Sequence, residues 1–407
     1  MVACLFPMNF PACKHRKPKS AVVASLRWLA SEPFRVFFFS GAVWSIIGVS
    51  LWPLFYAQKL GFYPSIVHAR IMIEAFGAAF VIGFLGTAGP RMATAPKLTP
   101  LELIWLFTLH QASAISHLRL HQSLGDALFA ALLFSLLAIL VTRVVRFGKE
   151  MPPPQMLLAL TGLICGITGS LLSLAPSTLT DPRHFRLAGL LLYQGLLLPP
   201  VLGIGSFIFP RMLGGDFGEP ATPLEARNKR VRTIAAAALL VGSFFVEAFG
   251  WPLVGYALRA ITAAAYLLVE VRWRKAADDP PRGSLAAGMK WSLVTGFLGL
   301  ALAGFFYTQH ISIEHLLYIG GFGLLILVVA SRVLFGHSGD LAGFSNRSGF
   351  VRFLIFLGIL TAATRATPAW IPSTTVSHHI YAAWTWGLLA LLWLIWHRRR
   401  FVTREEE

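Results

Sequence analysis

Apolar runs of about twenty residues recur along the whole chain and constrain its fold more than any other feature. The hydrocarbon core of a bilayer is roughly 30 Å thick, so a helix needs about 20 apolar residues to cross it. Of the 407 residues, 56% are hydrophobic and only 13% are charged, and the mean hydropathy is +0.66. This composition excludes an ordinary soluble domain. The runs predict an all-α integral membrane protein with about twelve transmembrane helices.

Short segments rich in proline, glycine and charge separate the predicted helices. Their ranges are 34–57, 66–88, 100–120, 123–145, 155–175, 187–209, 232–249, 252–271, 288–308, 314–335, 350–366 and 378–397. We expect them to form a single transmembrane domain over 33–400. An N-terminal tail, 1–32, would precede it, and a C-terminal tail, 401–407, would follow it.

Basic residues are distributed unevenly among the predicted loops. If the N-terminus is cytoplasmic, the cytoplasmic loops and tails hold most of the 35 Lys and Arg, which is the positive-inside pattern. Both termini are then cytoplasmic, and the number of helices is even. The formal charge of +17 therefore reflects topology, and nucleic-acid binding is not expected. We expect a multi-pass protein of the bacterial inner membrane, with the lipid bilayer as its general partner.

Three arginines at regular spacing indicate an internal repeat. Arg91, Arg211 and Arg332 end the second, sixth and tenth predicted helices, and they lie 120 and 121 residues apart. The tetrapeptide Thr-Pro-Leu-Glu follows the first two arginines, at 99–102 and 222–225. This spacing predicts three pseudo-repeats of four helices, over 34–147, 155–275 and 288–400. The layout is similar to that of the haem-copper oxidase core subunit, a likeness of fold that by itself warrants no function.

Histidines gather on one side of the membrane in this topology. Imidazole binds haem iron and copper, so an outward-facing metal site is the favoured explanation of the bias. The alternative is the preference of amphipathic side chains for the interface. In the third predicted helix, His110, His117 and His121 lie almost on one line. His110 is either a ligand or a neutral histidine bonded to a neighbouring helix. His378 and His379 point about 100° apart on a helix, so we expect only one to face the bundle.

His68 and His315 stand at the outer ends of the second and tenth predicted helices. The repeat relates these two helices, so they could present two axial ligands to one haem. Met72 shares a helix face with His68. Arg365, near the outer end of the eleventh helix, would pair with a haem propionate or act as a snorkelling interfacial arginine.

The second predicted helix combines an ion pair with many small residues. Arg70 and Glu74 have the i,i+4 spacing of a helical ion pair, separate from the face of the histidine. Small residues admit either close helix packing or a flat macrocycle laid against the backbone. They are Ala75, Gly77, Ala78, Ala79, Gly83 and Gly86 in this helix, and Gly320, Gly321 and Gly323 in the tenth.

Several motifs from Pro33 onward resemble those of the NnrS family of bacterial membrane proteins. They include Phe34-Arg35-Val36-Phe37-Phe38, His68-Ala69 with Glu74, Phe209-Pro210-Arg211, and the run from His315-Leu316 through Ser331-Arg332-Val333 to Gly336-His337-Ser338-Gly339. The last block is the most specific. The resemblance implies a haem- and copper-containing polytopic membrane protein connected with nitric oxide and nitrosative stress.

One residue departs from the family pattern. Family members carry a second histidine, in a pattern like His-Ala-His-Glu-Met, where this chain has Arg70. Arginine stays protonated and cannot serve as a metal ligand. If the family histidine binds metal, this chain has lost the ligand or recruits another, such as His117 or His379. The resemblance also covers His337, which falls on the cytoplasmic side and is expected to be structural or proton-handling.

These observations favour a haem-binding and potentially copper-binding membrane protein that senses, binds or relieves nitric oxide. One alternative is a small-solute transporter, for which twelve helices would normally form two halves of six. Another is a structural membrane subunit with a degenerate metal site. The sequence shows no electron path, so catalytic turnover is left open and no residue is assigned a catalytic role.

Overall fold

The structure, a computed structural model, describes residues 21–213, 222–271, 283–340, 343 and 346–403. These residues form helices and no strand. The helical elements are α1 (Ala21–Ser31), α2 (Phe34–Tyr56), α3 (Ser65–Arg70), η1 (Ile71–Gly77), α4 (Ala78–Met92), α5 (Pro100–Leu118), α6 (Gln122–Thr142), η2 (Arg143–Phe147), α7 (Met156–Ser173), α8 (Pro176–Thr180), α9 (Pro182–Leu190), η3 (Leu191–Gly195), α10 (Leu196–Met212), α11 (Pro223–Ala248), α12 (Pro252–Glu270), α14 (Ser284–Phe305), η4 (Tyr307–Gln309), α15 (His310–His315), η5 (Leu316–Gly323), α16 (Leu324–Gly336), α18 (Gly349–Ala366), η6 (Thr367–Ala369), η7 (Pro372–Thr374) and α19 (Thr375–His397).

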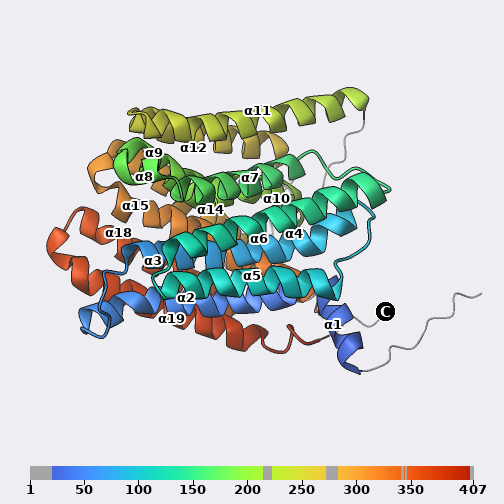
Figure 1. Ribbon diagram of the computed structural model, residues 1–407, viewed down its shortest axis with the longest axis horizontal. Coiled ribbons are helices and arrows are strands. Elements are labelled where there is room, and N and C mark those ends of the chain that lie inside the picture. The colour runs from blue at the N-terminus through green and yellow to red at the C-terminus, as the bar shows by residue number, and fades with distance from the viewer. Residues whose placement is uncertain (1–20, 214–221, 272–282, 341–342, 344–345, 404–407) are drawn as a thin grey trace, which may run out of the picture.

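Eleven helical segments of the described chain are long and apolar enough to cross a membrane. Six of them join consecutive elements without a break: α3 with η1 and α4, α6 with η2, α9 with η3 and α10, η4 to α16, α18 with η6, and η7 with α19. All lie side by side in one bundle, with α11 along one edge and α19 along the other (Figure 1). The protein is therefore a multi-pass membrane protein, as the apolar runs predict.

The remaining predicted span, 100–120, forms α5 but is not among the eleven. Its apolar run is interrupted by polar side chains, including His110, Gln111 and His117, which lower its hydropathy. The helix begins with a complete capping box, in which Thr99 accepts from the Glu102 amide and the Glu102 carboxylate accepts from Thr99 N at 2.7 Å. It packs on α6 along its length (Figure 1).

The seventh predicted helix starts too late in the sequence. We predict it over 232–249, but α11 begins at Pro223. Thr222 caps this helix by accepting from the Glu225 amide at 3.2 Å. The basic residues from Arg227 onward predict a loop, because charged residues usually lie outside a membrane span. They belong to α11 nonetheless, since a helix can continue beyond the apolar part that crosses the membrane.

Four of the spans contain a π-helical segment: η2 lies at the end of the span that begins with α6, and the other three segments lie at a similar place along their spans. These three segments are η1, η3 and η5, and each lies in a span that ends near one of the arginines of the predicted repeat. A π segment inserts an extra residue per turn and changes which side chains face the bundle. All three segments contribute residues to the wall of the same cavity, described below.

Close helix contacts hold the bundle together. A Cβ at Gly83 would lie 2.9 Å from Phe34 Cα, so only glycine admits the approach of α4 to α2. Likewise, a Cβ at Gly320 would lie 2.7 Å from the Thr295 hydroxyl, and a Cβ at Gly321 would lie 2.9 Å from Gly296 Cα. Of the two explanations for these small residues, helix packing accounts for these three.

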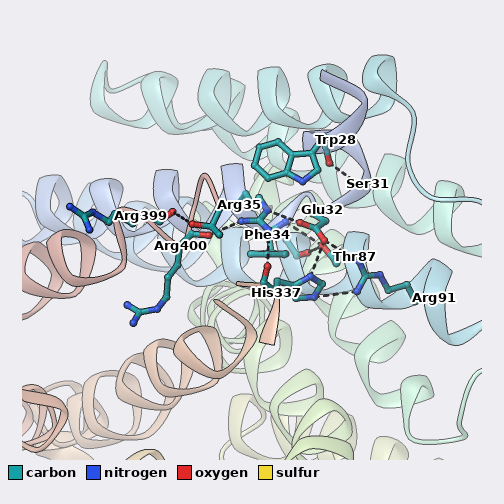
Figure 2. A network of polar contacts seen from close by, with 12 residues as sticks. Trp28, Ser31, Glu32, Phe34, Arg35, Thr87, Arg91, His337, Arg399 and Arg400 are labelled. Atoms are coloured by element: carbon teal, nitrogen blue, oxygen red, sulfur yellow. Dashed lines mark hydrogen bonds and ion pairs between the residues drawn. The ribbon is translucent and has the colours of Figure 1, made fainter. Parts of the chain in front are cut away.

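The two ends of the bundle differ in their polar side chains. We call the end where α2 finishes the histidine end, because His68, His310, His315 and His379 lie there. The opposite end, where α2 begins, is the arginine end, with Arg35, Arg91 and Arg400 (Figure 2). In Figure 1 the histidine end lies on the left, near α3 and α9, and the arginine end lies on the right, near α1.

Candidate functional site

A cavity of about 480 Å³ lies in the bundle at the histidine end. Its volume falls within the range of small-molecule and cofactor sites, roughly 300–1,000 Å³. Apolar and aromatic side chains form most of its wall. The polar and metal-ligating residues in the wall are Ser65, His68, Met72, Arg186, Tyr193, His310, Glu314, His315, Tyr318, Thr361, Arg365 and His379. The four residues that we expect to bind a cofactor, His68, Met72, His315 and Arg365, thus line one space.

The imidazoles of His68 and His315 are each held by a hydrogen bond to a backbone carbonyl. His68 Nδ1 donates to Gly48 O at 2.9 Å, and His315 Nδ1 donates to Ile311 O at 2.7 Å. A carbonyl only accepts, so Nδ1 carries the proton and Nε2 keeps its lone pair. Within the described residues neither Nε2 has a hydrogen-bond partner. This is the arrangement in which histidines bind metals.

His379 lies on the same wall, close to His68. The Trp52 ring contacts both histidines, with its centroid 4.6 Å from that of His379 and 6.0 Å from that of His68. His379 Nδ1 is 2.9 Å from the Tyr56 hydroxyl. Its neighbour His378 does not line the cavity and donates to Thr374 O at 3.1 Å. As the spacing predicts, one of the two adjacent histidines faces the bundle.

Arg365 is a buried cation without a carboxylate partner. Its side chain is 8% exposed, and its nearest polar contact is the Ser312 hydroxyl, 3.5 Å from Nη1. No carboxylate of the described chain lies within 4 Å of its guanidinium. A buried charge is costly unless it is paired, so this position suits an anionic group in the cavity.

The histidines of α5 lie outside the cavity, and the two buried ones use both ring nitrogens. His110 Nε2 donates to Ala75 O at 3.0 Å, and His110 Nδ1 accepts from Gln111 at 2.8 Å. His117 Nε2 is 3.0 Å from Glu74 Oε2, and its Nδ1 is 2.7 Å from the Gln122 amide oxygen. His121 is exposed in the turn before α6. The structure therefore does not bring these three histidines to one site.

Arg70 belongs to a buried charge cluster beside the cavity rather than to its wall. The expected pair with Glu74 is present, with 3.4 Å between Nε and Oε1, but Arg70 also lies 3.0 Å from Asp126 Oδ1. It donates to the Tyr193 hydroxyl at 3.3 Å, and Tyr193 lines the cavity. At the position of the family histidine, the chain thus carries a cation that offsets two carboxylates.

Three residues of this cluster could hold a metal ion. Ligand atoms of Glu74, His117 and Asp126 all lie within 4.8 Å of one another, and all three side chains are buried. Gly125 makes room for the imidazole, because a Cβ there would lie 2.4 Å from a His117 ring carbon. Arg70 already supplies one positive charge to this cluster.

A second buried charge cluster borders the cavity and was missed in the sequence. Arg186 pairs with Glu247 at 2.5 Å and with Glu314 at 3.1 Å. Arg259, with no exposed surface, pairs with Glu247 and donates to Gln194 at 2.8 Å. The positive charges of the two arginines thus balance the negative charges of the two glutamates. Their presence inside apolar spans was the available signal, because ionisable residues at such positions are expected to be functional or paired.

The motif residues at the arginine end form a network that joins distant parts of the chain (Figure 2). The Glu32 carboxylate accepts from Arg35 at 2.6 Å, from His337 Nδ1 at 2.9 Å and from Arg91 at 3.1 Å. Arg35 also donates to Arg400 O at 2.6 Å. Burial opposes ionisation of Glu32, but the His337 and Arg35 contacts prevail and lower its pKa to about 2.

The block that ends α16 has a structural explanation. His337 lies at the opposite end of the bundle from the cavity and binds Glu32, which agrees with a structural role. Gly339 has φ of +72°, a conformation that glycine adopts without strain. Arg332 lies in α16, which ends at Gly336. In the sixth predicted helix, Pro210 is buried in α10, and Arg211 lies over the Phe207 ring at 4.2 Å.

The chain was compared with protein-family models and with curated proteins. No curated protein matches it. The family model described as NnrS protein matches residues 28–404, which include all eleven spans and the whole wall of the cavity. A match of this extent covers most of the chain, and the chain therefore belongs to the NnrS family.

Proposed function

We propose that this chain is a haem-binding membrane protein that takes part in the response to nitric oxide and nitrosative stress. Haem would occupy the cavity at the histidine end, where His68 and His315 would hold its iron. The observation that carries the proposal is that these two imidazoles, from spans far apart in the sequence, line the same largely apolar cavity.

The two imidazoles are prepared for iron without further rearrangement of their protons. Gly48 O and Ile311 O each accept the Nδ1 proton, which fixes the tautomer and turns the Nε2 lone pair away from that bond. Met72 lines the cavity one turn from His68 and supplies a soft thioether beside the same space. Bound haem would supply an iron centre at which nitric oxide can bind.

Other residues of the wall match the charged propionates and the apolar ring faces of haem. Arg365 would neutralise a propionate, which would also give its buried guanidinium a partner. Trp52, Phe76, Phe322 and Trp386 form apolar parts of the wall and would exclude water from the ring faces. Gly77 and Gly323 lie on this wall too, although each also contacts a neighbouring side chain closely.

Copper is the second cofactor that the family resemblance suggests. His379 is the best-placed ligand, since it lines the cavity beside His68 and only its Nδ1 is engaged, by Tyr56. His110 and His117 have both nitrogens in hydrogen bonds, so either would have to break one to bind copper. His121, which is exposed, and His378, which is half-buried, do not line the cavity, so neither shares a site with the ligands in its wall.

The proposal includes an orientation and an internal symmetry. We infer that the arginine end is cytoplasmic, because the positive-inside rule places most loop arginines there, and that both termini lie on that side. We also infer one transmembrane domain over 33–400, built from three units of four helices. The π segments η1, η3 and η5 support the repeat, because each lies in the second helix of its unit.

An absorbance spectrum of the detergent-purified protein, oxidised and reduced, tests the proposal. We expect the bands of a haem with two histidine ligands, and we expect His68→Ala and His315→Ala each to lose them while membrane insertion is kept. His121→Ala is the matched control, since this exposed histidine lies outside the cavity. Unchanged spectra in both cavity variants would contradict the ligand assignment.

A further inference from the structure

A second cavity, of about 560 Å³, lies at the arginine end of the bundle. It is bounded by the last turns of α19, the residues that follow α19, the start of α18 and the segment after α16. Its wall consists of Ser338, Asp340, Phe350, Leu392, Ile395, Trp396, Arg398, Arg399, Arg400 and Thr403. None of these residues lines the histidine-end cavity, so the proposed haem site does not account for this second space.

The wall of the second cavity is divided into a cationic part and an apolar part. Three consecutive arginines, 398–400, follow the last turn of α19. Leu392, Ile395 and Phe350 form the apolar part, on helices that are long and apolar enough to span the membrane. Ile395 is 46% exposed, so this apolar part continues onto the outside of the bundle.

The arginines leave positive charge without a partner in the cavity wall. Arg400 pairs with Asp340 at 2.7 Å. Arg398 donates to Ile395 O at 3.3 Å, and neither Arg398 nor Arg399 pairs with a carboxylate of the described residues. Figure 2 shows the Arg399 and Arg400 side chains leading away from Glu32, so the network around that carboxylate does not neutralise them.

We propose that this cavity binds an anionic phospholipid. Arg398 and Arg399 bind its phosphate, since guanidinium groups make strong, charge-assisted hydrogen bonds to phosphate oxygens. One acyl chain runs along Leu392 and Ile395 toward the outside of the bundle. The apolar part of the wall favours a lipid over free phosphate as the ligand, because a small soluble anion would leave those apolar side chains without a contact. Basic pockets between membrane helices bind lipid head groups in this way.

Thermal unfolding of the full-length protein in detergent tests the proposal. Phosphatidylglycerol and phosphatidylcholine with identical acyl chains are added, and bound lipid is counted by native mass spectrometry. We expect phosphatidylglycerol to raise the unfolding midpoint and to stay bound, and phosphatidylcholine to do neither. In the double variant Arg398→Ala/Arg399→Ala, the affinity for phosphatidylglycerol falls on the order of tenfold or more. Arg400 is left intact because it also holds Asp340.

Two controls separate a built site from general attraction of charge. Arg347→Ala/Arg352→Ala removes two exposed arginines that do not line the cavity, and it should bind phosphatidylglycerol like the parent protein. Glycerol phosphate carries the phosphate without acyl chains and should give no shift at concentrations where the lipid saturates. Equal effects of the two lipids, equal losses in the two double variants, or an equal shift with glycerol phosphate would each overturn the lipid site.

Discussion

Single side chains determine the electrostatics of the histidine end. Arg70 stands where the family pattern has a histidine, and its guanidinium lies between Glu74 and Asp126. These two buried carboxylates need a cation nearby, because an unpaired buried charge costs several kcal/mol. Arg70 therefore neutralises charge at this position, and the imidazoles in the cavity wall near it are those of His68, His310, His315 and His379.

Restoring the family histidine should destabilise this chain. In Arg70→His the carboxylates of Glu74 and Asp126 lose their arginine, and we expect the free energy of unfolding to fall by about 3 kcal/mol. Adding Asp126→Asn removes one of the two stranded charges, so the double variant should lose less than the sum of the single losses. Unfolding in mixed detergent micelles measures both. Additive losses would show that the three side chains do not act as one cluster.

Helices and their contacts determine where the cavity walls stand. The approach of α4 to α2 depends on Gly83, whose missing Cβ leaves room for the Phe34 backbone. In the three long spans that contain η1, η3 and η5, the π segment changes the helix register at the wall of the cavity. At α11 the sequence misleads, because the basic residues from Arg227 onward indicate a loop, yet they belong to a helix that begins at Pro223 and is capped by Thr222.

The contact of α4 with α2 gives a matched pair of glycine substitutions. A Cβ at Gly83 would meet Phe34 Cα at 2.9 Å, whereas a Cβ at Gly242 of α11 meets no atom within 4 Å. We expect Gly83→Ala to destabilise the protein by about 1–3 kcal/mol through overpacking. Gly242→Ala should be neutral or stabilising by up to about 1 kcal/mol, since alanine favours helix. Unfolding midpoints in detergent distinguish the two, and equal effects would contradict the close approach of these helices.

Across the whole molecule, the two ends of the bundle differ in structure: one holds the cavity and the other holds the polar network around Glu32. The histidine end encloses the cavity, and at the arginine end Glu32, just after α1, binds Arg35 of α2, Arg91 of α4 and His337, just after α16 (Figure 2). Because Arg35 binds both Glu32 and the carbonyl of Arg400, the network joins the start of α2 to the residues after α19. The pairing thus closes the bundle at this end.

This closure should depend on pH through Glu32. Its pKa in the folded protein is about 2, below the ordinary value of 4.5, so its stabilisation is complete above about pH 5 and is lost as the pH falls toward 2. We expect Glu32→Gln to cost roughly 2 kcal/mol at pH 7 and clearly less at pH 3.5. Thermal unfolding at both pH values measures the difference. Glu150→Gln removes an exposed carboxylate as the control, and a pH-independent cost of the Glu32 change would contradict the prediction.

Much of the architecture follows from local properties of the chain. Eleven of the predicted spans form helices that can cross a membrane, because transfer of twenty apolar residues into a bilayer depends on composition alone. His68, Met72, His315 and Arg365 were also recognisable as site candidates, since each carries metal-ligating or charged chemistry within or beside an apolar run. The capping box at Thr99 is equally local.

The partners of these residues depend on packing between distant segments. The sequence does not reveal that His379 shares a wall with His68, that Arg70 meets Asp126, or that Arg259 meets Glu247 and Gln194. His110, His117 and His121 follow one helical line, yet hydrogen bonds engage both nitrogens of the two buried rings, with Ala75 and Gln111 for His110 and with Glu74 and Gln122 for His117, and the third histidine is exposed. Periodicity determines which face of a helix a side chain occupies, whereas the neighbour of that face is set by long-range packing, which brings residues together across the whole length of the chain.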